Sequence, residues 1–431
     1  MGNLSALSGS PTLVLIFICN QFLTSFGISL YPAFTLFLFY GGFYIISTLN
    51  SGQGLNSSNK NIFLLHLFLL FYGFVMFYLF EVGIFDRESA SWWNFNSVVK
   101  FISIIVASLA VIVTPIKQIY KSILLIRNIA YFMVIGSVLY YMLPFFGINF
   151  FSSDELAGYR YNGGINSYII AGQFLIAGLV AHILIYQNKS LTKTAIAISF
   201  FLFAIIATKD RTSLGSMLII LAILFYRAGF GISPFNFKIR KHIIVLFLAP
   251  TIILFTNLQY QSIVSGDLEE IDSTIHRIII NVRSYELFKK VFPIGGGPGS
   301  QTFLMSEEKI TYEFSEDGSE NSALTSELIR EIDKFQTNVA RKAKISPHNT
   351  YVDFLVPFGI TGLFFAMCVL FQQMSSIKRI LVVKNNPTVV LDSYMISGIL
   401  FFMFSSLFNL WWLYLIYYRV LISKKTNKLS V

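Results

Sequence analysis

The sequence predicts an all-α, polytopic integral membrane protein, and its composition and hydropathy support this fold class. Of the 431 residues, 55% are hydrophobic and only 13% are charged, and the mean hydropathy is +0.66. A soluble chain normally carries about 25% charged residues, so this chain has too little polar surface to cover a soluble globule. In a bilayer, helices of about 20 apolar residues are favoured because each one satisfies its own backbone hydrogen bonds.

Hydropathy divides the apolar part of the chain into about twelve candidate spans. They cover residues 11–29, 31–48, 61–82, 97–114, 122–148, 165–186, 193–208, 212–229, 241–258, 350–372, 388–407 and 409–423. The chain is therefore expected to have three parts. Nine helices lie in residues 1–258, a large polar loop covers 259–349, and three helices and a tail follow in 350–431.

Lysines and arginines in the short connections predict the orientation of the chain. If the N-terminus is cytoplasmic, 17 of the 32 lie in inner connections, 5 in short outer connections and 10 in the long loop. Of the 22 acidic residues, only Asp392 then lies on the inner side. We therefore expect both termini in the cytoplasm and the 259–349 loop outside. The net charge of +10 then reflects topology and does not indicate nucleic-acid binding.

The cysteines give no sign of a disulfide framework or a metal site. Cys19 and Cys368 both lie in apolar segments, and the long loop has none. No cluster of metal ligands is visible, so we expect neither a metal nor another cofactor. The N-terminal MGNLSALSGS lacks a positively charged segment, so the first span is expected to be retained and not cleaved as a signal.

The long outer loop contains two segments in which apolar residues recur at helical spacing. These segments, 267–290 and 321–344, are typical of amphipathic helices that lie on a membrane surface or cover a cavity. Between them, PIGGGPGS ends the first helix, because prolines and glycines break helices. Its Gly296 and Gly297 predict either a tight turn or an anion-binding nest. The run is not a P-loop, since no Lys-Ser/Thr follows it and no strand precedes it.

Four arginines at the expected outer face are candidate phosphate ligands. Arg211 lies in ATKDRTSLGSM, on a tight outer turn, where positive charge is disfavoured by topology and a guanidinium can bind phosphate through two parallel hydrogen bonds. Arg160, in GYRYNGGINSY, is either an interface anchor or a functional residue. Arg277 and Arg283 are six residues apart on the first loop helix. Each is either a solvated loop charge or a phosphate ligand.

His348 is the candidate for proton transfer. It stands at the outer end of a predicted span, beside Asn349 and five residues before Asp353. A neutral imidazole there can accept a proton from a hydroxyl group, because its pKa lies near ambient pH. The alternative is a histidine at a helix start that is hydrogen-bonded locally.

Three stretches of this sequence resemble the superfamily of O-antigen polymerases and O-antigen ligases, which are bacterial envelope enzymes. The stretches are ATKDRTSLGSMLIILAIL at 207–224, RIIINVRSYELFKKVFPIGGGPGS at 277–300 and PHNTYVDFLVPFGITGLFF at 347–365. Together they cover about 60 residues, and the plan of twelve spans with one long outer loop before the last three also fits. The turn at 210–212 reads Asp-Arg-Thr, where the family often has Ser-Arg-Gly.

The resemblance implies roles for individual residues. Arg211 matches an arginine that holds the diphosphate of a polyprenyl carrier, and Arg277 matches a second one, with Arg283 as the alternative. Arg160 resembles an arginine in an earlier outer loop, and His348 matches the histidine thought to activate the acceptor hydroxyl. Asn349, Asp353, Gly296 and Gly297 would support the site.

The resemblance also implies a fold, a location and partners. The fold would be similar to that of the GT-C glycosyltransferases, in the bacterial inner membrane with the active site facing the periplasm. The substrate would be an oligosaccharide on undecaprenyl diphosphate, transferred without a metal, and a chain-length regulator protein is a further expected partner.

Three functions compete at this point. A polymerase would move the growing glycan onto the non-reducing end of another carrier-linked repeat unit, for O-antigen or capsule. A ligase would transfer it to the lipid A core. A polysaccharide flippase or transporter would also have about twelve spans, but it should have short loops and charges inside the bundle. The 90-residue outer loop therefore argues against a flippase or transporter.

Overall fold

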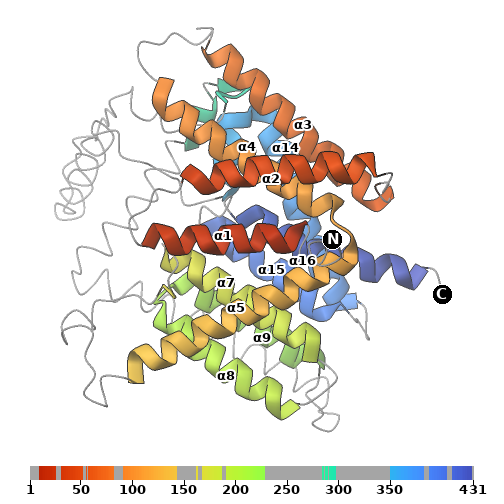
Figure 1. The fold of residues 1–431 in the computed structure, drawn as a ribbon. Helices are drawn as coiled ribbons and strands as arrows, with labels where there is room; N and C mark the ends of the chain where they lie inside the picture. The colour runs from red at the N-terminus through yellow and green to blue at the C-terminus, as the bar shows by residue number, and fades with distance from the viewer. Residues whose placement is uncertain are drawn as a thin grey trace, which may run out of the picture.

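The computed structural model is a bundle of helices (Figure 1). It describes residues 9–25, 31–51, 55, 57–81, 91–142, 162–163, 167–186, 191–228, 284–285, 287–289, 291–297, 350–382, 388–404 and 410–429. Within these residues the regular secondary structure is helical throughout. The helices are α1 (Ser10–Ser25), α2 (Tyr31–Asn50), α3 (Ser57–Glu81), α4 (Ser91–Val113), α5 (Ile116–Met142), α7 (Tyr168–Tyr186), α8 (Leu191–Ala207), α9 (Arg211–Ala228), α14 (Thr350–Val382), α15 (Val389–Phe404) and α16 (Trp411–Leu429).

Four of these helices are long and apolar enough to cross a membrane. Their apolar segments are 59–76, 116–141, 168–186 and 354–382. Six shorter apolar helical segments accompany them, at 10–23, 34–50, 98–113, 194–207, 212–226 and 389–399. The all-helical class is confirmed for the described residues, and these helices fit a membrane protein. The count of twelve spans is not reached, in part because the expected span at 241–258 lies outside the described residues.

The outer surface of the bundle carries large apolar side chains. Phe39, Phe43, Phe132 and Phe371 are each at least 70% exposed. A soluble protein rarely leaves a broad apolar surface in water, whereas lipid solvates such rings. This distribution supports placement of the bundle in a membrane.

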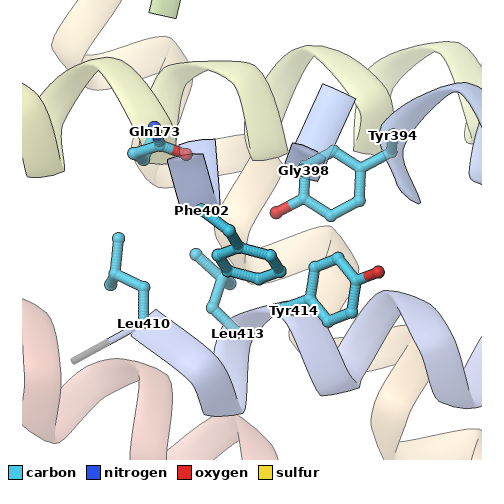
Figure 2. A pocket seen from close by; sticks show the side chains of 7 residues that line it. All are labelled: Gln173, Tyr394, Gly398, Phe402, Leu410, Leu413 and Tyr414. Carbon is cyan, nitrogen blue, oxygen red and sulfur yellow. The ribbon is translucent and has the colours of Figure 1, made fainter. Parts of the chain in front are cut away.

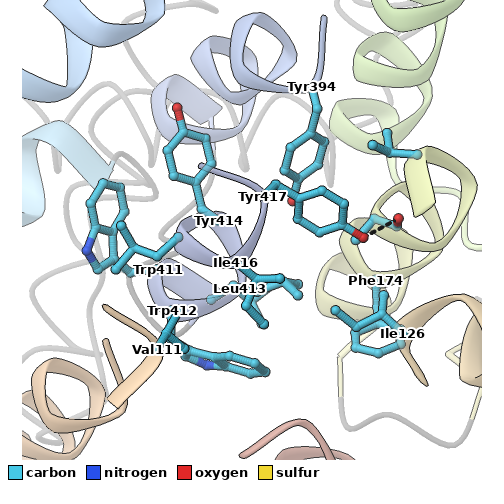
Figure 3. Packing of buried hydrophobic residues seen from close by; sticks show 14 of the residues in the cluster. Val111, Ile126, Phe174, Tyr394, Trp411, Trp412, Leu413, Tyr414, Ile416 and Tyr417 are labelled. Carbon is cyan, nitrogen blue, oxygen red and sulfur yellow. Dashed lines mark hydrogen bonds between the residues drawn. The ribbon is translucent and has the colours of Figure 1, made fainter. Parts of the chain in front are cut away.

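The first half of helix α16 is packed inside the bundle, where its side chains meet residues from other helices such as Phe174 and Tyr394 (Figure 3). Its residues from Trp411 to Tyr417 are buried. Trp412 packs on Phe17 of α1, with ring centroids 5.3 Å apart, and the Tyr417 hydroxyl donates a 2.6 Å hydrogen bond to the Ala177 carbonyl of α7. The C-terminal helix therefore joins helices from the start and the middle of the chain.

Two arginines satisfy polar groups at helix ends. Arg419 of α16 donates to the Thr114 carbonyl at 3.1 Å, just beyond the end of α4, where carbonyl groups lack partners within the helix. Arg379 of α14 binds Asp392 of α15, with Nη2 2.5 Å from Oδ1. Thr388 donates to the other oxygen of Asp392 at 2.8 Å. Asp392, the acidic residue expected on the inner side, is thus paired with a positive charge within the fold.

Helix boundaries agree with hydropathy at some ends and differ at others. Helix α5 begins at Ile116, whereas the span was expected from 122, because Pro115 precedes the first turn and the polar residues of that turn do not prevent helix formation. Helix α14 extends to Val382, ten residues beyond the expected span. Both extensions belong to the apolar helical segments 116–141 and 354–382, which reach beyond the expected spans at these ends.

Candidate functional site

The turn between α8 and α9 sets the position of Arg211. Asp210 is 6% exposed, and its carboxylate accepts hydrogen bonds from the Thr212 amide at 3.3 Å and the Ser213 amide at 3.1 Å. It also accepts a hydrogen bond from the Ser213 hydroxyl. These bonds satisfy amide groups that have no partner in the first turn of a helix. Arg211 is the first residue of α9, directly after this cap.

Helix α7 packs closely against this first turn of α9. A Cβ atom at Gly172 would overlap the Ser213 hydroxyl and lie 3.2 Å from Oδ2 of Asp210. Only glycine allows this approach. Further along, the Ser216 hydroxyl of α9 donates to the Ser397 carbonyl of α15 at 3.4 Å. The beginning of α9 is therefore held between α7 and α15.

Backbone hydrogen bonds join the glycine run of the long loop to α14 at the point where Gly359 interrupts that helix. The amide of Gly296 donates to the Val356 carbonyl at 2.9 Å, and the amide of Gly297 donates to the Pro357 carbonyl at 2.8 Å. In return, the Ile360 amide donates to the Pro293 carbonyl at 2.8 Å. We call residues 293–297 with 356–360 the glycine clasp. It attaches a segment within the long loop to the helix that follows the loop.

The glycine clasp requires glycine at its points of contact. Gly359 has φ 54°, a left-handed conformation that breaks α14, and Gly297 has φ 84°. A Cβ at Gly359 would overlap the Pro293 carbonyl oxygen. Tyr72 of α3 donates a hydrogen bond to the Ile294 carbonyl. The amides of Gly296 and Gly297 already have acceptors, so this segment is a turn that supports the helix, and the anion-nest interpretation is wrong for these two amides.

A small buried pocket lies between α7, α15 and α16 (Figure 2). It is lined by Gln173, Tyr394, Gly398, Phe402, Leu410, Leu413 and Tyr414. Gln173 is 5% exposed, and its Nε2 atom has no hydrogen-bond partner in the part of the chain that the structure describes. The ionisable residues of the spans gave no indication of this pocket, because Gln173, a polar residue within a span that lines it, is neutral. The amide of Gln173 in an otherwise apolar helix was the available signal.

Most of the predicted site residues lie outside the described part of the chain. These are Arg160, Arg277, Arg283, His348 and Asn349. Arg211 and Asp353 are described as helical residues of α9 and α14, but their side chains are not. Only Gly296 and Gly297 are described in full. The structure thus describes the turn that precedes Arg211 and the glycine clasp that contains Gly296 and Gly297.

The described residues contain no group of three or more His, Cys, Asp or Glu side chains that could hold a metal ion. Comparison of the chain with protein-family models, with curated proteins and with solved structures found no match.

Proposed function

We propose that this protein is a membrane glycosyltransferase that polymerises O-antigen or capsule repeat units carried on undecaprenyl diphosphate. The observation that supports this most is the position of Arg211 at the head of α9, within the stretch that resembles the polymerase and ligase superfamily. Near the start of a helix, a guanidinium adds to the positive end of the helix dipole. This combination suits an anion such as a diphosphate.

Arginines would bind the leaving group of the reaction. The donor's glycosyl residue is attached to a diphosphate, which takes on negative charge as the bond to the anomeric carbon breaks. Arg211 and a loop arginine, Arg277 or Arg283, would stabilise that charge, and Arg160 is a further candidate. The proposed reaction therefore needs no metal ion.

His348 would act as the general base. As the acceptor hydroxyl oxygen forms its bond to the anomeric carbon, its proton passes to the imidazole, and undecaprenyl diphosphate leaves with the electrons of the broken C–O bond. Asn349 and Asp353 would hold the imidazole. The glycine clasp supports this assignment indirectly, because it connects the loop to α14, whose first residue, Thr350, comes two residues after His348.

The proposed topology follows from the hydropathy of the chain, from the distribution of its lysines and arginines, and from the family resemblance. It has about twelve spans in a GT-C-like arrangement, both termini in the cytoplasm, the bacterial inner membrane as the location and a periplasmic active site. A chain-length regulator protein is a proposed partner. A ligase that transfers the glycan to the lipid A core is the second candidate, since its donor and diphosphate chemistry are the same.

Deletion of the gene and electrophoresis of lipopolysaccharide would test the proposal. Loss of a polymerase leaves core capped with a single repeat unit, whereas loss of a ligase leaves bare core while polymer accumulates on the carrier. Unchanged lipopolysaccharide and capsule would overturn both functions.

Complementation with His348→Ala or Arg211→Ala should reproduce the deletion at normal protein levels. We expect at least a hundredfold loss of polymer, since removing a general base costs about 10²–10⁴-fold and removing a group that stabilises the charge of the leaving group costs about 10²–10³-fold. His242→Ala, a histidine beside a basic segment at 238–241, is the matched control and should keep activity. Full activity of His348→Ala would remove that residue from the mechanism.

A further inference from the structure

One face of α5 is exposed along most of the length of the helix. The exposed side chains recur three or four residues apart, so they lie on the same side of the helix. This stripe consists of Lys117, Lys121, Leu124, Asn128, Phe132, Ile135 and Leu139. Other residues of α5 pack against α1, α7, α8 and α16. The stripe therefore begins with two cationic groups and continues with mainly apolar ones, which matches the order of headgroup and acyl chain in a phospholipid.

The two lysines of the stripe occupy positions that the electrostatics of the helix disfavour. Lys117 lies in the first turn of α5, where the positive end of the helix dipole repels a cation, and no acidic residue lies in that turn. Lys121 follows four residues later on the same exposed face. Like charges at this spacing destabilise a helix. An anion bound between the two ammonium groups would relieve both repulsions.

The turn between α4 and α5 receives a further positive charge from α16. Arg419 donates a 3.1 Å hydrogen bond to the Thr114 carbonyl, so its guanidinium lies at the carbonyl end of α4, which otherwise carries partial negative charge. Helices α1, α7, α8 and α16, which pack against α5, contain no aspartate or glutamate, and neither do α4 and α5 themselves. The electrostatic potential at the start of α5 is therefore positive, and the surrounding helices supply no acidic side chain to balance it.

We infer that this face of α5 binds an anionic phospholipid of the membrane leaflet that surrounds the α4–α5 turn. The lipid phosphate accepts hydrogen bonds from Lys117 and Lys121, because lysine can extend its charge to a headgroup while its methylene groups lie on apolar surface. One acyl chain lies along the apolar part of the stripe, from Leu124 to Leu139. A zwitterionic lipid carries its own cation and gains less from the two lysines. The inference requires the bundle to lie in a membrane, and it does not depend on the proposed reaction.

Native mass spectrometry of the purified full-length protein tests the inference. The protein is released from nanodiscs that contain equal amounts of phosphatidylglycerol and phosphatidylcholine, and the lipids that stay bound are identified. We expect the wild type to retain phosphatidylglycerol in at least tenfold excess. Each lysine near an anionic headgroup contributes about fivefold in affinity. The double variant Lys117→Gln/Lys121→Gln should therefore reduce this preference at least tenfold, whereas Lys117→Arg/Lys121→Arg should keep it.

Lys60→Gln is the matched control, and it should retain the lipid preference. Lys60 is also an exposed lysine in the first turn of an apolar helix, α3, but no other basic residue lies three or four positions from it. An equal loss of preference in Lys60→Gln would show that net charge alone selects the lipid, and would overturn the site. Glycerol 3-phosphate, a soluble phosphate without acyl chains, should not displace the bound phosphatidylglycerol. Its displacement by glycerol 3-phosphate would overturn the assignment to a lipid.

Thermal unfolding in detergent gives a second measurement on the same variants. Both lysines are exposed, and the double glutamine variant should be at least as stable as the wild type because it removes a pair of like charges. Added phosphatidylglycerol should raise the melting temperature of the wild type, since a ligand that binds only the folded state stabilises it, and should raise that of the double variant much less. A folded Lys117→Gln/Lys121→Gln protein that keeps the wild-type preference for phosphatidylglycerol would overturn the inference.

Discussion

Asp210 shows how one side chain can set the position of a neighbouring candidate residue, Arg211. Its carboxylate accepts hydrogen bonds from the Thr212 and Ser213 amides, so the first turn of α9 begins at a defined residue, Arg211. The sequence predicted a tight turn here and a role for Arg211. It did not predict the cap, because an aspartate between a lysine and an arginine is equally consistent with a solvated surface charge.

Replacing Asp210 with alanine should destabilise the protein by about 1–2 kcal/mol, since this removes the helix cap. Asp210→Asn is the matched control and should cost less than Asp210→Ala, because its single amide oxygen can still accept from one of the two amides. Unfolding in detergent, followed by tryptophan fluorescence, measures both. Equal stability of Asp210→Ala and the wild type would contradict the capping role.

At the scale of elements, the glycine clasp determines where α14 changes direction. Three backbone hydrogen bonds join residues 293–297 to residues 356–360, and Gly359 breaks the helix at that point. The sequence indicated that Pro293 and the following glycines end a helix. It could not show that their amides donate to carbonyls about sixty residues later, since backbone hydrogen bonds do not depend on which side chains are present.

Gly359→Ala should destabilise the protein by about 1–3 kcal/mol, because alanine is strained at φ 54° and its Cβ would overlap the Pro293 carbonyl. Gly42→Ala in α2 is the control. A Cβ there meets nothing within 4 Å, and alanine favours a helix by up to about 1 kcal/mol. Thermal unfolding of the two variants should therefore shift in opposite directions. A Gly359→Ala protein as stable as Gly42→Ala would show that the clasp contributes little.

At the scale of the whole molecule, aromatic contacts and buried polar pairs join the helices of the bundle, and some of these helices are far apart in the sequence. Helix α16 packs against α1 and α7, and Arg379 and Asp392 join the end of α14 to the start of α15. Hydropathy predicted the helices because their apolar composition is a local property. Which helices are neighbours depends on pairs such as Trp412 and Phe17, about 400 residues apart, and the sequence alone does not reveal these.

Asp392→Leu should cost about 3 kcal/mol or more, because it leaves the Arg379 guanidinium without its carboxylate at a largely buried position. The double variant Arg379→Leu/Asp392→Leu should recover most of this loss, since an apolar pair of similar volume often replaces a buried ion pair without cost. Unfolding of the single and double variants gives the coupling directly. A double variant less stable than Asp392→Leu alone would contradict this account.

The short turns of the bundle also constrain how the protein is made. Only Thr114 and Pro115 separate α4 from α5, and only residues 208–210 separate α8 from α9. In the proposed topology, a link this short cannot span a hydrocarbon core about 30 Å thick, so the two helices of each pair would enter the bilayer together, as a hairpin. In that topology Lys209, Asp210 and Arg211 would cross during synthesis as a single charged tip. The Asp210 cap, which forms within that tip, reduces the number of unpaired amides that cross with it.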